Sequence, residues 1–194
     1  MRHKNILRIT IATICILLIP LVAMQFTDEV VWTVGDFIFA GVLLFGSGLV
    51  YELAARKANT AVYKVAIGLA VATMLLLVWI NAAVGIIGDD TTANLMYIGV
   101  FAAGFIGAIV SRLQPRGMSY VLFSMAAVQL AIPVAALVLW PDVSWGAPGV
   151  AGTFILNAFF ALLFIGSALL FRQAWTEKIN RRLSIARRDH VTNI

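Results

Sequence analysis

The sequence has few charged residues. Asp, Glu, Lys and Arg make up 12% of its 194 residues, whereas they make up about a quarter of an ordinary soluble domain. Hydrophobic residues account for 62% of the chain, and the mean hydropathy is +0.97. This composition excludes an ordinary soluble domain and indicates an integral membrane protein.

The side chains that usually carry chemistry are also scarce. Cys15 is the only cysteine, so no disulfide within the chain and no thiolate metal site is expected. His3 and His190 lie near opposite ends, outside the apolar runs, which excludes a bis-histidine haem. All four lysines lie outside these runs or at their edges, which excludes a retinal Schiff base deep in a helix.

Sequence motifs for catalysis are missing as well. The chain contains no HExxH zinc motif, no GxSxG elbow and no P-loop. We therefore expect no metal, no cofactor and no catalytic residue. An enzyme that acts on lipid through acidic side chains is the least favoured functional class.

Six long hydrophobic runs are present instead. They cover residues 9–26, 34–55, 62–87, 95–111, 118–140 and 150–171. Each run is about long enough to cross the roughly 30 Å hydrocarbon core of a bilayer. The short loops between the runs make successive helices antiparallel neighbours. The sequence thus predicts an all-α integral membrane protein whose residues 1–172 form one domain, an up-and-down bundle of six transmembrane helices.

Three of the loops contain no basic residue. All 14 Lys and Arg residues fall before the first run, in the second and fourth loops, or after the last run. The loops without a base hold acids instead, namely Asp28, Glu29, Asp89, Asp90 and Asp142. Because basic loops stay on the cytoplasmic side, both termini are predicted to be cytoplasmic. We expect the inner (plasma) membrane of a bacterium.

Two features refine this topology. The first run resembles the start of a secretory signal, but no small-x-small cleavage site follows it, so we expect it to be retained as a helix. Aromatic residues lie near the ends of the runs, as in an interfacial belt. Those at the predicted outer ends are Trp32, Tyr97, Trp140 and Trp145.

Residues 173–194 form a basic cytoplasmic tail. Trp175, Ile179, Leu183 and Ala186 would share one stripe of a helix, with the bases elsewhere. That pattern suits a short amphipathic helix on the inner leaflet, with its bases among anionic lipid headgroups. A solvated basic end that only enforces topology fits equally well. No nucleic-acid motif accompanies the bases, so no nucleic-acid partner is expected.

Small residues form stripes on two predicted helices. Gly41, Gly48 and Glu52 share one face of the second helix. On the third helix, Asn81, Gly85 and Gly88 are predicted to do the same. Inside a bilayer such stripes allow close helix packing, within the bundle or against a second copy or another membrane protein.

Glu52 is the acid with the clearest partner. Arg56 follows it by four residues, in the favoured order for a helical ion pair. The long arginine side chain can also reach the membrane interface. A structural ion pair is therefore favoured over a proton carrier.

Polar residues gather in the outer half of the predicted bundle. Asp36 is shallow, Asn81 and Asn157 lie roughly 10 Å deep, and Gln129 lies roughly 15 Å deep, at about 1.5 Å per residue. Polar side chains inside a membrane usually face the bundle interior. The four residues therefore predict a polar pocket, open to the outside and ringed by acids. Amides that only bond across helices are the alternative interpretation.

Two functional classes follow. The first is a permease or channel-like protein for a small solute or cation, with Asp36, Asn81, Gln129 and Asn157 as ligand or pore residues. The second is a non-catalytic subunit or assembly partner that docks through its glycine faces and basic tail. An internal acidic residue with its pKa moved towards neutrality would favour the first class, and a lipid-facing stripe of small residues would favour the second.

Overall fold

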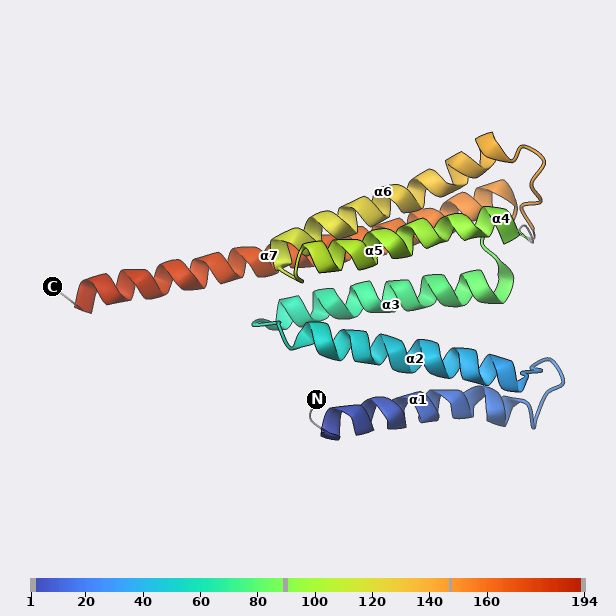
Figure 1. The fold of residues 1–194 in the computed structure, drawn as a ribbon, viewed down its shortest axis with the longest axis horizontal. Helices are drawn as coiled ribbons and strands as arrows, with labels where there is room; N and C mark the ends of the chain where they lie inside the picture. The colour runs from blue at the N-terminus through green and yellow to red at the C-terminus, as the bar shows by residue number, and fades with distance from the viewer. Residues whose placement is uncertain (1–2, 89–90, 147, 193–194) are drawn as a thin grey trace. The chain divides into compact units, whose positions relative to one another are not determined.

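The structure is a computed structural model. It describes the backbone of residues 3–88, 91–146 and 148–192, and the side chains of residues 4–88, 92–146 and 148–185. Within this part of the chain it contains helices and no strand (Figure 1). Six segments are long and apolar enough to cross a membrane. The prediction of an all-helical chain with six membrane-length helices is therefore confirmed, whereas the acidic loop residues Asp89 and Asp90 lie outside the described residues.

The chain divides into two compact units, Met1–Arg56 and Lys57–Ile194. The first unit is a hairpin of α1 (His3–Ala23) and α2 (Val34–Ala55). Glycine lets the two helices approach closely, since a Cβ atom added at Gly48 would lie 2.7 Å from Cγ2 of Ile9. At Gly41 an added Cβ atom would lie 3.5 Å from Cδ1 of Leu17, which is an ordinary contact. The glycine stripe predicted on the second helix thus packs against α1.

The second unit contains the remaining helices. These are α3 (Ala61–Val84), α4 (Thr91–Asn94), the 3-10 helix η1 (Leu95–Tyr97), α5 (Ile98–Val110), α6 (Pro115–Leu139) and α7 (Gly149–Thr192). The long helix α7 packs against both α6 and α3, and α5 packs against α6. The α7 rings of Phe160, Phe164 and Phe171 are at most 1% exposed. They form the centre of the apolar core of this unit.

Helix α3 ends earlier than predicted. It was expected to reach residue 87 but ends at Val84, because Gly85 takes a φ of +63° and Gly88 a φ of +49°. Positive φ is open to glycine at little steric cost and breaks the helical path. The predicted stripe of Asn81, Gly85 and Gly88 on one helix face is therefore wrong, since both glycines lie in the chain reversal after α3.

The fourth membrane segment, Thr92–Val110, is not a uniform α-helix. The single α-helical turn α4 and the 3-10 helix η1 precede α5, and only η1 is wound more tightly than an α-helix. The 3-10 turn brings Tyr97 into the interior, where it is 1% exposed. Tyr97 was predicted to lie in the interfacial belt, and this prediction is wrong.

Helix α7 joins the predicted sixth span to the predicted tail. It is continuous over 44 residues, a length of about 66 Å at 1.5 Å per residue. No glycine or proline occurs between Gly166 and Thr192 to interrupt it. In Figure 1 its C-terminal part extends beyond the ends of α3, α5 and α6.

Candidate functional site

The structure brings together two of the four predicted pore residues. Nε2 of Gln129 on α6 donates a hydrogen bond of 2.9 Å to Oδ1 of Asn157 on α7. Both side chains are completely buried. Asn157 also donates to the carbonyl of Thr153, one helical turn earlier, at 2.8 Å. This bond fixes the amide orientation, so Oδ1 of Asn157 faces its neighbours as an acceptor.

Gln129 keeps an unused acceptor in this buried environment. Its Oε1 atom has no hydrogen-bond partner among the described residues. Its backbone carbonyl also lacks the usual helical donor, because Pro133, four residues later, has no N–H. A buried acceptor without a partner costs about 1–3 kcal/mol. The amide pair is therefore an incomplete polar site, suited to a molecule that donates hydrogen bonds or carries positive charge.

Tyr97 connects this pair to a pocket. Its hydroxyl donates a 3.0 Å hydrogen bond to Oδ1 of Asn157, the same atom that accepts from Gln129. Tyr97 also lines a cavity of about 410 Å³ at the end of α3. Sequence reasoning missed its role, because a tyrosine near the end of an apolar run is usually interfacial.

Asn81 lines the same cavity, at the C-terminal end of α3. Its Nδ2 atom lies 3.5 Å from Oδ1 of Asn94, at the long limit of a hydrogen bond. The structure therefore separates Asn81 from the buried pair, and the Tyr97 ring lies between the cavity and Asn157. Of the predicted residues, Asn81 belongs to the open cavity and the other two amides to the core behind it.

Asn94 organises this end of the unit and was missed from the sequence. Its Oδ1 accepts hydrogen bonds of 2.9 Å from the backbone N–H groups of both Ile86 and Ile87. Its Nδ2 donates to the carbonyl of Gly88 at 3.0 Å and to that of Ile87 at 3.3 Å. An asparagine side chain can replace backbone partners in this way. The signal in the sequence was an Asn close after a Gly-x-x-Gly reversal.

A further hydrogen bond ties this reversal to α7. The hydroxyl of Thr153, which is fully buried, donates to the carbonyl of Ile86 at 3.3 Å. Ile86 and Ile87 are themselves at most 1% exposed. Residues 85–88 are therefore packed against α7, and Gly85 and Gly88 line the cavity.

Asp36, the fourth predicted pore residue, lies in the first unit and starts α2. Its carboxylate accepts from the backbone N–H of Thr33 at 2.7 Å and from the Thr33 hydroxyl at 2.8 Å. The same hydroxyl accepts from the N–H of Asp36, which completes a capping box. The carboxylate is thus used in helix capping, and the side chain is exposed.

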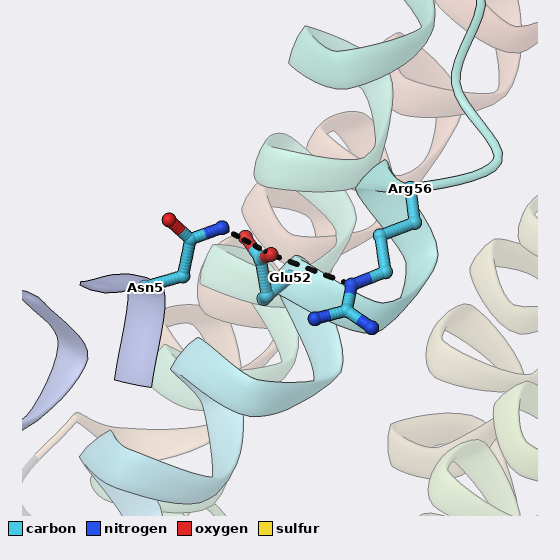
Figure 2. A network of polar contacts seen from close by, with 3 residues as sticks. All are labelled: Asn5, Glu52 and Arg56. Atoms are coloured by element: carbon cyan, nitrogen blue, oxygen red, sulfur yellow. Dashed lines mark hydrogen bonds and ion pairs between the residues drawn. The ribbon is translucent and has the colours of Figure 1, made fainter. Parts of the chain in front are cut away.

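Glu52 forms the centre of a small polar network in the first unit. Figure 2 shows its carboxylate between Asn5 of α1 and Arg56 at the end of α2. Nδ2 of Asn5 donates to Oε1 of Glu52 at 2.6 Å, and Nε of Arg56 lies 3.4 Å from the same oxygen. Glu52 therefore both pairs with Arg56 and ties α2 to α1, a second role that the sequence did not indicate.

The groups around the cavity have limited chemistry. Amides, a phenol and backbone carbonyls can donate and accept hydrogen bonds and can coordinate a cation through oxygen. Within the described residues, no group of three or more His, Cys, Asp or Glu side chains is placed to hold a metal ion. The arrangement suits recognition of a polar molecule or ion.

Comparison with known proteins gives no match, whether with family models, with curated proteins or with solved structures. The functional argument therefore rests on the residues of this chain.

Proposed function

We propose that this protein is a small permease or channel-like membrane protein for a small polar solute or cation. The substrate first enters the cavity at the C-terminal end of α3, lined by Asn81, Asn94 and Tyr97. This end faces the outside if the basic loops are cytoplasmic. In this proposal both termini are cytoplasmic and the membrane is the plasma membrane of a bacterium.

One observation carries the proposal. Polar groups continue from the open cavity into the middle of the bundle, through Tyr97 and Asn157 to the unpaired Oε1 atom of Gln129. A hydrogen bond between membrane helices contributes only about 0.6–2 kcal/mol, so amides that served packing alone would be expected to satisfy each other. The free acceptor at the end of this series supports a substrate that supplies a donor or a positive charge.

The route is closed in this structure. Tyr97, Asn157 and Gln129 are each at most 1% exposed. Movement of the Tyr97 ring, with loss of its bond to Asn157, would connect the cavity to the amide pair. The structure then corresponds to a closed state, and transport requires a second arrangement in which Tyr97 has moved.

The uncharged lining favours small substrates. Each described side chain that lines the cavity is neutral, so a dianion or a large charged solute has no counter-charge there. This neutral lining supports a monovalent cation or a small neutral molecule as the substrate.

The alternative is a non-catalytic subunit or assembly partner. Its predicted docking faces included the glycine stripe of the second helix, but Gly48 packs against Ile9 within its own unit. The remaining support is the extended end of α7, where Leu183 and Ile185 are more than half exposed. Purification of one stoichiometric membrane partner would favour this alternative.

A flux assay tests the proposal. The purified chain is reconstituted in liposomes, and uptake of Na⁺, K⁺, ammonium and glycerol is compared with that of protein-free liposomes. We expect at least one probe to cross faster with the protein. Asn81→Leu should return that flux to background while the helical content by circular dichroism stays unchanged, because Asn81 lines the cavity and is only partly buried.

Asn59→Leu is the matched control, since Asn59 is exposed and lies before α3, at its other end. It should transport as the parent does. Equal flux through the parent and Asn81→Leu, or background flux for every probe, would contradict the proposal. Orientation is tested separately in intact cells: cysteines beside Asp28 and Asp142 should react with an impermeant reagent, and a cysteine beside Arg116 should not.

A further inference from the structure

A second pocket lies at the opposite end of the unit Lys57–Ile194. It has a volume of about 150 Å³ and is lined by three basic residues, Lys57, Arg112 and Lys178. They come from three separate segments: the chain before α3, the loop between α5 and α6, and α7. None of the described lining residues is acidic. Three positive charges that converge without a counter-charge indicate a site for an anion.

The backbone adds to the positive potential of this pocket. Thr60, the N-cap of α3, and Gln114, the N-cap of α6, both line it. The N-terminal ends of two helices are therefore directed to the same place, and each carries a partial positive charge from the helix dipole. The Thr60 hydroxyl caps its own helix, whereas the Gln114 side chain makes no capping bond. Pro115, the first residue of α6, also lines the pocket and has no N–H, so α6 contributes its helix dipole rather than a backbone donor.

The loop that carries Arg112 is held in an unfavourable conformation. Arg112 and Leu113 have φ values of +52° and +58°, in the left-handed region that favours glycine. Nζ of Lys57 donates to the carbonyl of Arg112 at 3.3 Å, and the Tyr63 hydroxyl donates to the carbonyl of Leu113. Strain of this kind is typical of ligand sites. Glycine would fit at this position without strain.

The residues around the basic pocket are those expected at the headgroup level of a membrane. Nζ of Lys178 lies 5.8 Å from the centre of the Trp175 ring. Tryptophan beside lysine at the end of a membrane helix is typical of the headgroup region. Basic pockets between membrane helices at the cytoplasmic face are known sites for anionic lipid headgroups. The exposed apolar residues Val65 and Leu169 on the adjoining turns of α3 and α7 provide surface for acyl chains.

We propose that this pocket binds the phosphate of an anionic phospholipid in the leaflet at this end, the cytoplasmic leaflet in the predicted topology. The volume of the pocket suits a phosphate group rather than a whole headgroup, so the rest of the lipid lies outside it. The quaternary ammonium group of phosphatidylcholine would be repelled by the three basic side chains. The pocket therefore selects lipids with net negative charge. This proposal is independent of the transport proposal, which concerns the other end of α3.

Native mass spectrometry of the full chain in detergent tests the proposal, with phosphatidylglycerol, phosphatidylcholine and inorganic phosphate as probes. We expect phosphatidylglycerol to bind at least about tenfold more tightly than phosphatidylcholine, since each base near a headgroup contributes severalfold in affinity. The triple variant K57Q/R112Q/K178Q should lose this preference. The control K64Q/R181Q/R182Q removes the same charge from described bases outside the pocket and should keep most of the preference for phosphatidylglycerol.

Arg112→Gly separates binding from folding. Glycine relieves the left-handed strain, so the variant should unfold at the same temperature as the parent or higher, yet bind phosphatidylglycerol more weakly by about fivefold. Equal lipid binding by Arg112→Gly and the parent would overturn the proposal. So would equal losses in the triple variant and its control, which would indicate nonspecific attraction. Inorganic phosphate that binds as tightly as phosphatidylglycerol would identify a soluble phosphate compound as the ligand and overturn the lipid assignment.

Discussion

The two ends of the unit Lys57–Ile194 present opposite chemistry. The cavity at the C-terminal end of α3 is large, about 410 Å³, and every described side chain lining it is neutral. The pocket at the N-terminal end of α3 is small, about 150 Å³, and contains three bases. Buried amides need partners but carry no net charge, whereas lysine and arginine need water or anions. One end is therefore suited to weak, reversible recognition and the other to holding an anion.

The two ends also differ in how their chain reversals are built. At the cavity, glycines occupy the positions of positive φ, and Asn94 satisfies the backbone between them. At the basic pocket, Arg112 and Leu113 occupy such positions and are held by bonds from Lys57 and Tyr63. The reversal at the cavity is therefore unstrained, whereas the reversal at the basic pocket is strained and is held by hydrogen bonds from neighbouring side chains. Substitutions at the two ends should therefore have different consequences.

Asn94→Ala should have the largest effect, because it removes the organiser of the relaxed reversal. The N–H groups of Ile86 and Ile87 would lose their acceptor inside the protein, at about 1–3 kcal/mol for each unsatisfied group. We expect the free energy of unfolding in mixed micelles to fall by about 3 kcal/mol. Asn59→Ala at the basic pocket is the matched change and should alter it by less than about 0.5 kcal/mol. Similar losses of unfolding free energy for Asn94→Ala and Asn59→Ala would show that the two ends do not differ in this way.

Asn157→Leu should cause the second-largest loss of stability. It leaves the Tyr97 hydroxyl and Nε2 of Gln129 without their shared acceptor, at a cost of about 2 kcal/mol. The double variant Q129L/N157L should regain part of this loss, because it removes one stranded group along with its partner. Unfolding titrations of the parent, Gln129→Leu, Asn157→Leu and the double variant measure the coupling free energy between the two amides. A double variant with the summed loss of the singles would show that the amides act independently.

Tyr63→Phe should have a smaller effect at the basic end. The ring stays packed edge-on against Phe171, with 5.3 Å between ring centres, but the bond to the carbonyl of Leu113 is lost. We expect a loss of about 1 kcal/mol and faster hydrogen exchange in residues 111–114. The loss of stability caused by Tyr63→Phe should be smaller in the Arg112→Gly background, because the loop that carries residue 112 is then no longer strained. An undiminished loss would show that Tyr63 does not act on the loop conformation.

Loss of the ion pair between Glu52 and Arg56 should have the smallest effect on stability. Because this pair lies in the first unit, it serves as a reference for the two ends of the unit Lys57–Ile194. The side chain of Arg56 is 42% exposed, and exposed ion pairs contribute little. Glu52→Gln should destabilise slightly, because Arg56 loses its counter-charge while an amide can still bond to Asn5. E52Q/R56Q should recover most of that loss. A thermal melt of the two variants beside the parent measures both changes.

The sequence predicted the membrane segments well, because apolar runs need no knowledge of tertiary contacts. The early end of α3 and the 3-10 turn at residues 95–97 could not be predicted, because both depend on contacts across the chain. The end of α3 depends on the reversal at Gly85, and this reversal is held by bonds from Asn94 and Thr153. Positions of glycine show where a reversal can occur but not whether it does.

The candidate site was predicted only in part. Depth along the helices predicted a site shared by Asn81 and Asn157, with Gln129 below it, whereas in the structure Asn157 is hydrogen-bonded to Gln129. Depth says little about direction around a helix, so Asn81 was assigned to the same cluster although Tyr97 separates it from Asn157. Asp36 looked like an intramembrane acid, but its spacing from Thr33 also matches a capping box. The basic pocket was missed because its three bases come from distant parts of the sequence.

The uninterrupted helix α7 has a mechanical consequence. It carries Asn157 behind the cavity and Lys178 in the basic pocket, about 30 Å apart along its axis. A continuous helix moves as a rod, so a slide or turn that releases Asn157 from Tyr97 also displaces Lys178 from the other bases. If each of the two separately argued proposals holds, a lipid bound at one end of this helix resists its motion at the other end, and by linkage a solute that shifts the helix weakens lipid binding by the same free energy.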